Sequence, residues 1–276
     1  MNEHKVIDFH THSSESDGIL NPIALVSRAK ACGVEVLALT DHDTVAGVAV
    51  AREQAHKEGI GFVTGIEFSS VWEGVNIHVI GLHIDIDNPA LKNNIEIQGK
   101  ARQERAQLID QRLEKLGIKG ALAGATSIAG GGIVARPHFA EFMLQQGHVT
   151  SIESAFKKYL GDGKAGDVKH LWPELTTIVQ WIHEARGLAV LAHPNRYKMT
   201  NAKLRRLITA FKASGGDAME VISGQQEQKV TSYLADLANF YELQASAGSD
   251  FHDPNSPWQS LGGFGKLPAH CRVVSY

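Results

Sequence analysis

Residues 5–12 read KVIDFHTH, a short run of apolar and β-branched residues that ends in two histidines. On an extended strand, residues two positions apart point to the same face, so His10 and His12 lie side by side. A histidine pair of this kind at a strand end is typical of metal ligands. Asp8 shares their face, and we expect its carboxylate to orient one of the two rings. The stretch therefore predicts a strand that delivers metal ligands at its carboxyl end.

Polar clusters follow other predicted strands in the same way. They read LTDHD at 39–43 with His42, LAHP at 191–194 with His193, and GSDFH at 248–252 with Asp250 and His252. A charged cluster directly after a buried apolar run is costly unless its members have partners. These clusters therefore indicate several strand ends that contribute ligands to one site.

Three further candidates are ambiguous when each is taken alone. Asp17 lies in a Ser-Asp-Gly turn, where aspartate is common for conformational reasons. Glu67 follows Gly65 at the end of a predicted strand and resembles a surface carboxylate, whereas His78 lies in the apolar run VNIHVIG and resembles a core histidine. Together with the clusters they form a set that packing alone does not explain. The candidate ligands are His10, His12, Asp17, His42, Glu67, His78, His193, Asp250 and His252.

The chemistry of this set indicates which ions it would hold. Histidine nitrogens combined with carboxylate oxygens suit Zn²⁺, Mn²⁺ or Fe²⁺ better than Ca²⁺ or an iron–sulfur cluster. Nine ligands are too many for one ion, so we expect two or three. Ions roughly 3.5–4 Å apart generate hydroxide at neutral pH and clamp a phosphoryl group for in-line displacement. The set therefore predicts a metal-dependent hydrolase.

Runs rich in β-branched residues recur along the chain and predict seven or eight strands. They lie at 5–9, 35–40, 61–65, 75–82, 188–192, 218–222, 243–248 and 272–275. Segments of helical length lie between many of them, at 21–33, 44–59, 173–187, 200–215 and 225–241. Alternating strands and helices indicate a mostly parallel sheet covered by helices, and this number of strands favours closure into an α/β barrel. The sites of such barrels collect at the carboxyl ends of their strands, where the polar clusters lie.

The middle of the chain interrupts this alternation. From 88 to 172 no segment reads as a strand; helices are predicted at 89–117, 138–146 and 151–160, and 121–136 is rich in glycine and alanine. The run Gly130-Gly131-Gly132 has no preceding strand, and Gly163-Lys164 is followed by alanine, so neither is a nucleotide-binding loop of a known type. We expect a barrel formed by 1–87 and 173–276, with 88–172 as an inserted helical lid over its mouth.

Composition sets broad limits. The chain has 276 residues, of which 43% are hydrophobic and 21% charged, with a net charge of -3, so it exerts no general attraction on nucleic acid and any such binding must be local. Only Cys32 and Cys271 are present, which indicates a reducing compartment without a disulfide framework. We expect no signal peptide and no membrane-spanning segment, hence a cytoplasmic protein with no membrane partner. Nothing in the sequence indicates an obligate protein partner.

Taken in order, DFHTHS, SDG, LTDHD, GIEFS, HVIG, LAHP and GSDFH resemble the PHP (polymerase and histidinol phosphatase) superfamily. This resemblance implies a distorted (β/α)7 TIM-like barrel with a trinuclear centre of divalent metal ions, and all nine candidate ligands match the family pattern. It also implies a grouping of the ligands. His10, His12, Glu67 and Asp250 would hold one ion, Asp17, His42 and His252 a second, and Glu67 with His78 and His193 a third. Mn²⁺ is the expected metal, with Zn²⁺ or Fe²⁺ as alternatives.

The insertion narrows the resemblance to one branch. GGGIVARPHFAEFM, YLGDGKAGDV and AHPNRY look like the branch of nucleoside-3′,5′-bisphosphate phosphatases and the 5′–3′ exoribonuclease RNase AM. In that branch, basic residues of the insertion and the barrel rim hold substrate phosphates, a role that suits the planar fork of arginine. The matching positions are Arg136, His138, Lys164 and Arg196, and the implied catalytic residues are Asp250 and His193.

We therefore expect a metal-dependent phosphoesterase that acts on nucleotides. It would remove the 3′-phosphate of nucleoside 3′,5′-bisphosphates such as pAp, release mononucleotides successively from the 5′ end of short 5′-phosphorylated RNA, or do both. One alternative within the same fold is a phosphomonoesterase of the histidinol phosphatase type. The residues also leave open a metal-dependent amidohydrolase and a metal-bound domain that binds without catalysis.

Overall fold

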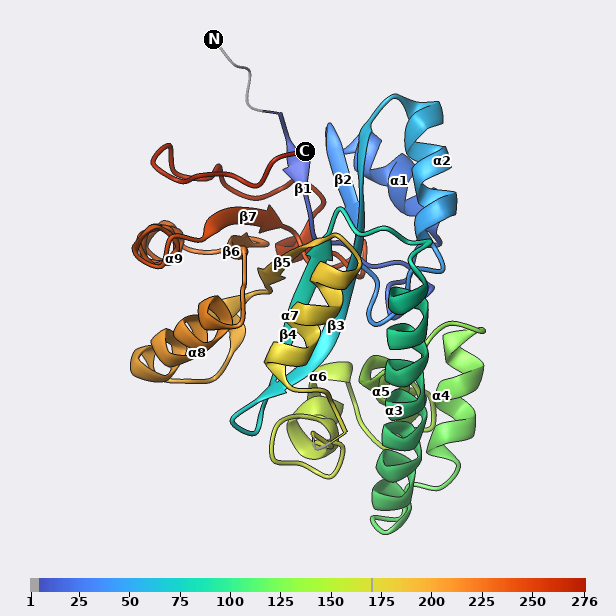
Figure 1. Cartoon of the computed structure of the whole chain (residues 1–276). Coiled ribbons are helices and arrows are strands. Elements are labelled where there is room, and N and C mark those ends of the chain that lie inside the picture. The colour runs from blue at the N-terminus through green and yellow to red at the C-terminus, as the bar shows by residue number, and fades with distance from the viewer. Residues whose placement is uncertain (1–4, 170) are drawn as a thin grey trace.

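The chain forms a nearly closed barrel in a computed structural model that describes residues 5–169 and 171–276 (Figure 1). Residues 1–4 of the expected barrel segment and residue 170 of the expected insertion lie outside the described residues. Within the described part, one sheet contains seven strands in chain order: β1 (Ile7–Asp8), β2 (Val36–Leu39), β3 (Gly61–Trp72), β4 (Val75–Leu82), β5 (Leu188–Leu191), β6 (Ala218–Ser223) and β7 (Gln244–Gly248). Phe9 N donates to Ala247 O at 3.0 Å, so β1 and β7 meet. The expected α/β barrel is confirmed.

Helices cover the outside of the barrel as predicted. They are α1 (Pro22–Ala31), α2 (Val48–Glu58), α7 (Leu175–Glu184), α8 (Asn201–Ala213) and α9 (Gln228–Phe240). Helix α1 begins where the sequence predicts, because the Asn21 side chain accepts from Ala24 N and Pro22 occupies the first turn. The apolar side of α8, which includes Leu207 and Phe211, is fully buried in the main core. No described helix has both the length and the apolar character needed to cross a membrane.

The sheet is mostly parallel, as expected, with one reversed strand. Strand β4 runs antiparallel to both β3 and β5, whereas the other neighbours are parallel. Strands β3 and β4 form a hairpin whose two-residue turn, Glu73-Gly74, has positive φ at both positions, as a tight hairpin requires. Because β4 is reversed, His78 in its first half lies at the same barrel end as the carboxyl ends of the parallel strands.

One predicted strand is longer than expected, and another does not form a strand. The strand expected at 61–65 continues to Trp72, so Glu67 lies inside β3 and not at its end. The hairpin with β4 supplies the hydrogen bonds that extend it. The strand expected at 272–275 is reduced to one isolated bridge between Ala245 and Val273, because β7 already closes the sheet against β1.

Residues 89–160 are mostly helical and have a separate apolar core. They form α3 (Pro89–Glu114), α4 (Ala121–Ala129), α5 (Arg136–Gln145), α6 (Ile152–Ala155) and a π-helical turn (Phe156–Leu160). Side chains such as Ile109, Leu113, Phe139 and Met143 are buried among these helices. In Figure 1 the long α3 runs beside α4 at one end of the barrel. The division into barrel and lid at 88 and 172 stays a prediction.

Candidate metal centre

All nine predicted ligands meet at one end of the barrel. His10 and His12 follow β1, Asp17 lies in the loop beyond them, His42 follows β2, Glu67 and His78 lie in β3 and β4, His193 follows β5, and Asp250 and His252 follow β7. Glu67 is fully buried at the centre of this set. A parallel bridge between His42 and Glu67 links the end of β2 to the middle of β3.

Four of the side chains converge on one point. His10 Nε2 and His12 Nε2 lie 3.0 Å apart, and each lies 3.3 Å from Glu67 Oε2 and 3.3 Å from Asp250 Oδ1. Atoms bonded to one ion at about 2.1 Å are separated from one another by roughly 3.0–3.4 Å in tetrahedral or octahedral geometry. The separations of these four atoms therefore match a shared ion.

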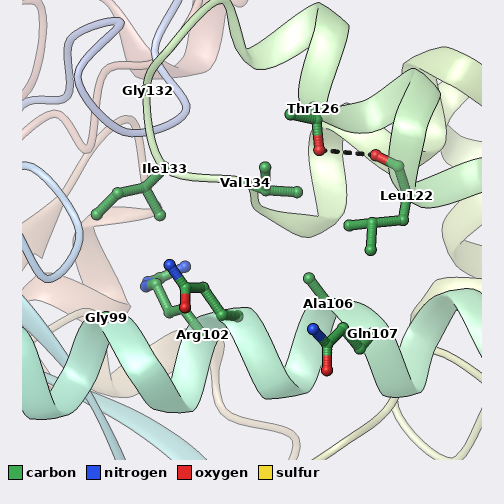
Figure 2. A pocket seen from close by; sticks show the side chains of 10 residues that line it. Gly99, Arg102, Ala106, Gln107, Leu122, Thr126, Gly132, Ile133 and Val134 are labelled. Atoms are coloured by element: carbon green, nitrogen blue, oxygen red, sulfur yellow. Dashed lines mark hydrogen bonds between the residues drawn. The ribbon is translucent and has the colours of Figure 1, made fainter.

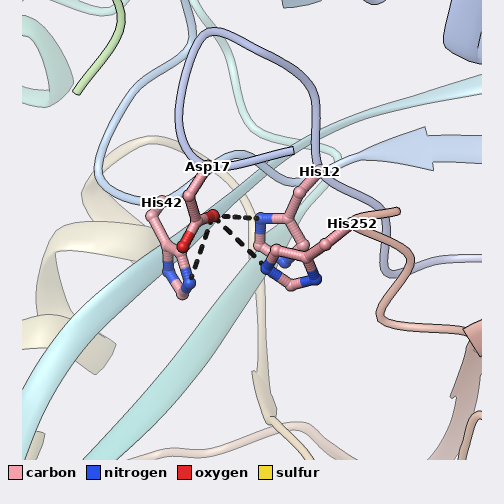
Figure 3. A group of neighbouring side chains, drawn as sticks. All are labelled: His12, Asp17, His42 and His252. Atoms are coloured by element: carbon pink, nitrogen blue, oxygen red, sulfur yellow. Dashed lines mark ion pairs between the residues drawn. The ribbon is translucent and has the colours of Figure 1, made fainter. Parts of the chain in front are cut away.

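A second group surrounds Asp17 (Figure 3). Asp17 Oδ1 lies 3.3 Å from His252 Nε2 and 4.0 Å from both His42 Nε2 and His12 Nδ1. These atoms come from three loops that follow β1, β2 and β7. The group holds an acidic oxygen between imidazole nitrogens, which is the donor arrangement of a divalent cation site.

A third group uses the other oxygen of Glu67. Glu67 Oε1 lies 3.0 Å from His193 Nε2 and 3.1 Å from His78 Nδ1. Glu67 Oε2 meanwhile contacts His10, His12 and, at 3.0 Å, His42 Nδ1. Glu67 is thus placed between two groups of imidazoles, with one carboxylate oxygen toward each.

Buried polar atoms in this cluster lack hydrogen-bond partners. Among the described residues they are His12 Nδ1, Asp17 Oδ1, His42 Nδ1, Glu67 Oε2 and His193 Nδ1. Buried polar groups are nearly always satisfied in folded proteins, so this concentration in one place requires an explanation. Divalent cations supply one, because nitrogen and carboxylate oxygen atoms without partners are suitable ligands. The residues present fit divalent metal ions.

The histidines of the cluster lower the pKa values of its carboxylates. Burial raises the pKa of Glu67, but the neighbouring charges of His10, His42 and His78 outweigh burial and hold that pKa well below its usual value. Burial likewise raises the pKa of Asp250, and the charges of His10 and His252 bring it well below normal. Both carboxylates are therefore ionised and ready to bind cations at neutral pH.

The backbone is strained where ligands leave the strands. His193 has φ 29° and Asp250 has φ 54°, although neither is glycine. Asp43, next to His42, has φ 55°. Left-handed backbone at non-glycine residues is uncommon and tends to gather at functional sites, where surrounding structure holds it in place. In this protein the left-handed residues lie in the segments that follow β2, β5 and β7, which also carry candidate ligands.

Glu220 orients the cluster and was missed from the sequence. This fully buried residue of β6 lies 2.9 Å from His10 Nδ1 and also accepts from the His193 backbone N–H and, at 2.8 Å, from Ser223 Oγ. The sequence feature that could have indicated this role is a carboxylate inside the apolar run AMEVI at 218–222. The role expected of Asp8 was wrong: it accepts backbone N–H groups of Ser249 and Gly262 and contacts no imidazole ring, because its side chain points toward the loops after β7.

Two further aspartates tie the site to its surroundings. Asp41 accepts from Ser13 N, Ser13 Oγ and Ser16 Oγ at 2.6–2.7 Å, which fixes the loop that carries Asp17. Asp43 accepts from Ser69 N, from Gln98 and from the Arg102 guanidinium. Gln98 and Arg102 belong to α3, so the insertion is anchored directly beside the end of β2.

A cavity lies between the candidate metal ligands and the insertion. We call it the metal-side cavity; its lining includes Asp17, His42, His78, Arg102, Arg105, Arg136, Phe156 and Trp172. Arg102 and Arg105 stack on Trp172, with guanidinium carbons 5.4 and 5.2 Å from its ring centre. Burial and the charges of Arg136 and Arg102 lower the pKa of Arg105 to about 9, so it stays protonated at neutral pH. Arg102 and Arg105 were missed, because in sequence they belong to a charged helical face.

The four predicted phosphate-binding residues have different surroundings. Arg136 lines the metal-side cavity and donates to Leu160 O at 3.2 Å. His138 accepts from Ala135 N through Nδ1, which caps α5, and it does not line that cavity. Lys164 is exposed in the loop after the π-helical turn. Arg196 pairs with Asp250 Oδ2 and donates to Ser223 O at 3.1 Å, so it positions a candidate ligand.

Comparison with known proteins agrees with this geometry. The model of the PHP domain matches residues 8–187. The chain is 46% identical over 266 residues to the 5′-3′ exoribonuclease Rnm of Escherichia coli (strain K12), covering 96% of this chain and 90% of that protein. It is 40% identical over 269 residues to a 3′,5′-nucleoside bisphosphate phosphatase of Chromobacterium violaceum, covering 97% and 94%.

A solved structure is also similar over nearly the whole chain. It is described as an amidohydrolase from Chromobacterium violaceum with bound sulfate and no metal, and it superposes with a TM-score of 0.90 at 40% identity. The match covers 97% of this chain and 93% of that one. With its barrel, its nine converging candidate ligands and these similarities, the chain belongs to the PHP domain family.

Proposed function

We propose that this protein is a metal-dependent phosphoesterase that acts on nucleotides in the cytoplasm. Its substrates would be nucleoside 3′,5′-bisphosphates, from which it removes the 3′-phosphate, and short 5′-phosphorylated RNA, from which it releases mononucleotides in the 5′–3′ direction. The two substrates share a phosphorus on the 3′ oxygen beside a 5′-phosphate, so one site serves both. The names of the relatives support each activity.

One observation carries the proposal: the metal-side cavity is lined both by candidate metal ligands and by Arg102, Arg105 and Arg136. Arg102 and Arg105 are buried and Arg136 is half-buried; Arg102 pairs with Asp43, whereas Arg105 and Arg136 form no ion pair with the described residues. Guanidinium groups gathered in this way favour a multiply charged anion, and arginine pairs two phosphate oxygens at once. The sulfate in the similar solved structure is consistent with an oxyanion site in this fold. A neutral amide substrate would not require such a concentration of positive charge, which argues against amide hydrolysis.

The nine ligands would hold two or three divalent ions, and we assign Mn²⁺ as the working metal. When bound, such ions supply a hydroxide nucleophile at neutral pH and neutralise charge on the phosphoryl group. Other residues of the chain hold the candidate ligands in position. Glu220 fixes the His10 ring, Arg196 holds Asp250 Oδ2, and Asp41 fixes the loop of Asp17.

We assign catalytic roles to Asp250 and His193 and substrate-phosphate contacts to Arg102, Arg105 and Arg136. Arg196 acts on the substrate indirectly, through Asp250. His138 and Lys164 lie outside the cavity lining, and their predicted contacts with substrate phosphates stay predictions. Residues 88–172 would serve as a lid that supplies the arginines, while the barrel supplies the ligands.

The test is a substrate panel with Mn²⁺-loaded protein. We expect phosphate release from pAp and mononucleotide release from a 5′-phosphorylated oligoribonucleotide, with little turnover of histidinol phosphate or of amides. Rapid turnover of histidinol phosphate alone would reassign the substrate. Hydrolysis of amides or lactones without any phosphate ester would overturn the phosphoesterase assignment, and binding without turnover would favour a non-catalytic domain.

A further inference from the structure

A second cavity lies in the insertion, beside the metal-side cavity. We call it the insertion cavity. Figure 2 shows α3 along one side of it, with the segment Gly132–Val134 and α4 along the other. Its volume of about 410 Å³ is within the range of small-molecule sites. Arg102 lines both cavities, so they adjoin at this residue.

The lining chemistry differs from that of the metal-side cavity. Apart from Arg102, the insertion cavity is lined by uncharged residues: Leu122, Ile133 and Val134 supply apolar walls, and Gln103 and Gln107 supply amides. The two glutamines are four apart on α3 and so share one face of the helix. This surface offers little to a phosphate. It suits a flat group with apolar faces and a hydrogen-bonding edge, which describes a nucleobase.

Glycine at position 99 keeps the cavity open. Gly99 lies inside the 26-residue helix α3, where glycine is among the least favourable residues. A Cβ built at this position meets no atom within 4 Å, so packing does not require glycine here. Gly99 nevertheless lines the cavity, and any larger side chain would project into that space.

The opposite wall is fixed to the barrel. Ile133 N donates to Glu15 O at 3.2 Å, and a Cβ at Gly132 would lie 2.3 Å from Ser14 O, so the backbones approach closely. The loop they contact is the one that carries Asp17. The insertion cavity therefore has a defined position relative to the candidate metal centre.

We propose that the insertion cavity binds the base of a nucleotide whose phosphates lie against the arginines of the metal-side cavity. This inference rests on the proposed function and adds a base-binding site to it. Arg102 then marks the boundary between the charged and uncharged parts of the substrate. A base next to the 5′-phosphate is present in both proposed substrates, so the site would serve both.

The experiment compares adenosine 5′-monophosphate with ribose 5-phosphate, which carries a hydroxyl group in place of the base. Calorimetry with Mn²⁺-loaded protein measures both affinities for the wild type, Gly99→Leu, Gln103→Ala and the control Gln111→Leu. Gln111 is exposed on the same helix and does not line the cavity. Because Gly99 has open space around it and leucine favours helices, Gly99→Leu should fold normally.

We expect the wild type to bind the nucleotide at least about tenfold more tightly than the sugar phosphate, which is within the contribution of one stacked base. Gly99→Leu should abolish that preference without changing the affinity for ribose 5-phosphate, Gln103→Ala should reduce it, and Gln111→Leu should match the wild type. No base preference in the wild type, or equal weakening of both ligands in Gly99→Leu, would overturn the proposal.

Failure of the base site and failure of the proposed function give different results. Release of phosphate from pAp together with an unchanged preference in Gly99→Leu would remove the base site alone. A preference that Gly99→Leu abolishes, in a metal-loaded protein that hydrolyses no phosphate ester, would retain the site and remove the phosphoesterase.

Discussion

Replacing Glu220 by glutamine should weaken metal binding indirectly. Glu220 is not itself a candidate ligand, but it contacts the candidate ligand His10. Glu220 Oε1 accepts from His10 Nδ1 at 2.9 Å, and Oε2 accepts from His193 N and from Ser223 Oγ. A glutamine has one accepting oxygen, and two hydrogen bonds are kept if that oxygen takes the Oε2 position. Its NH₂ group then faces His10 Nδ1.

The consequence is a change of tautomer. A histidine that must accept at Nδ1 carries its proton on Nε2, and Nε2 is the atom that converges with His12, Glu67 and Asp250. A protonated nitrogen does not bind a cation. Loss of the residue that orients a metal-binding histidine typically costs about 10–100-fold in metal affinity or activity.

Isothermal titration with Mn²⁺ would measure this effect, with activity followed against Mn²⁺ concentration in parallel. Glu104→Gln is the matched control, because Glu104 is exposed on α3. Glu220→Gln should need about 10–100 times more Mn²⁺ than the wild type, and saturating Mn²⁺ should restore most of the turnover. An Mn²⁺ affinity within about twofold of the wild type would refute the reasoning, since a tautomer change at His10 must alter binding.

Three other predictions address the same site. Asp250→Asn should abolish turnover, because a neutral amide cannot replace the carboxylate that lies 3.3 Å from both His10 and His12; wild-type rates of phosphate release in this variant would exclude Asp250 from the site. Arg136→Ala should raise KM for pAp at least tenfold more than KM for an aryl phosphate, as expected for loss of a charged hydrogen bond of about 1.5–3 kcal/mol. An equal rise in KM for both substrates would show that Arg136 does not bind the second phosphate. Removing metal with a chelator should lower Tm by about 8–16 °C, because Mn²⁺ at about 1,000-fold above its Kd stabilises the folded protein by about 4 kcal/mol. An unchanged Tm by calorimetry would mean that the cluster holds no ion in the folded protein.

The sequence predicted the barrel, and which residues converge at one end of it, because both depend on local patterns. His10 and His12 share a strand face by spacing alone, and polar clusters after buried runs mark the ends of strands. Bringing the nine residues together then follows from barrel closure, which places the ends of distant strands side by side. Helix α1 was located by its cap at Asn21 and by Pro22, which are also local signals.

Features that depend on long-range pairing were harder to predict. The reversal of β4 follows from the hairpin turn at Glu73-Gly74, which does not stand out among the other glycines of the chain. Glu220 and Arg102 gain their roles from partners far away in sequence, His10 and Asp43. A lone carboxylate in an apolar run, or an arginine on a charged helix, does not show which residue it will contact. Asp8 was assigned to the wrong partner for the same reason.

The most direct test of the metal-dependent phosphoesterase is a single titration. Metal-free protein is titrated with Mn²⁺, and bound manganese per chain and phosphate release from pAp are measured in the same samples. We predict that hydrolysis begins only as ions bind and reaches its full rate at two or three ions per chain. A protein that holds this amount of metal without releasing phosphate, or that releases phosphate with no metal bound, would contradict the assignment.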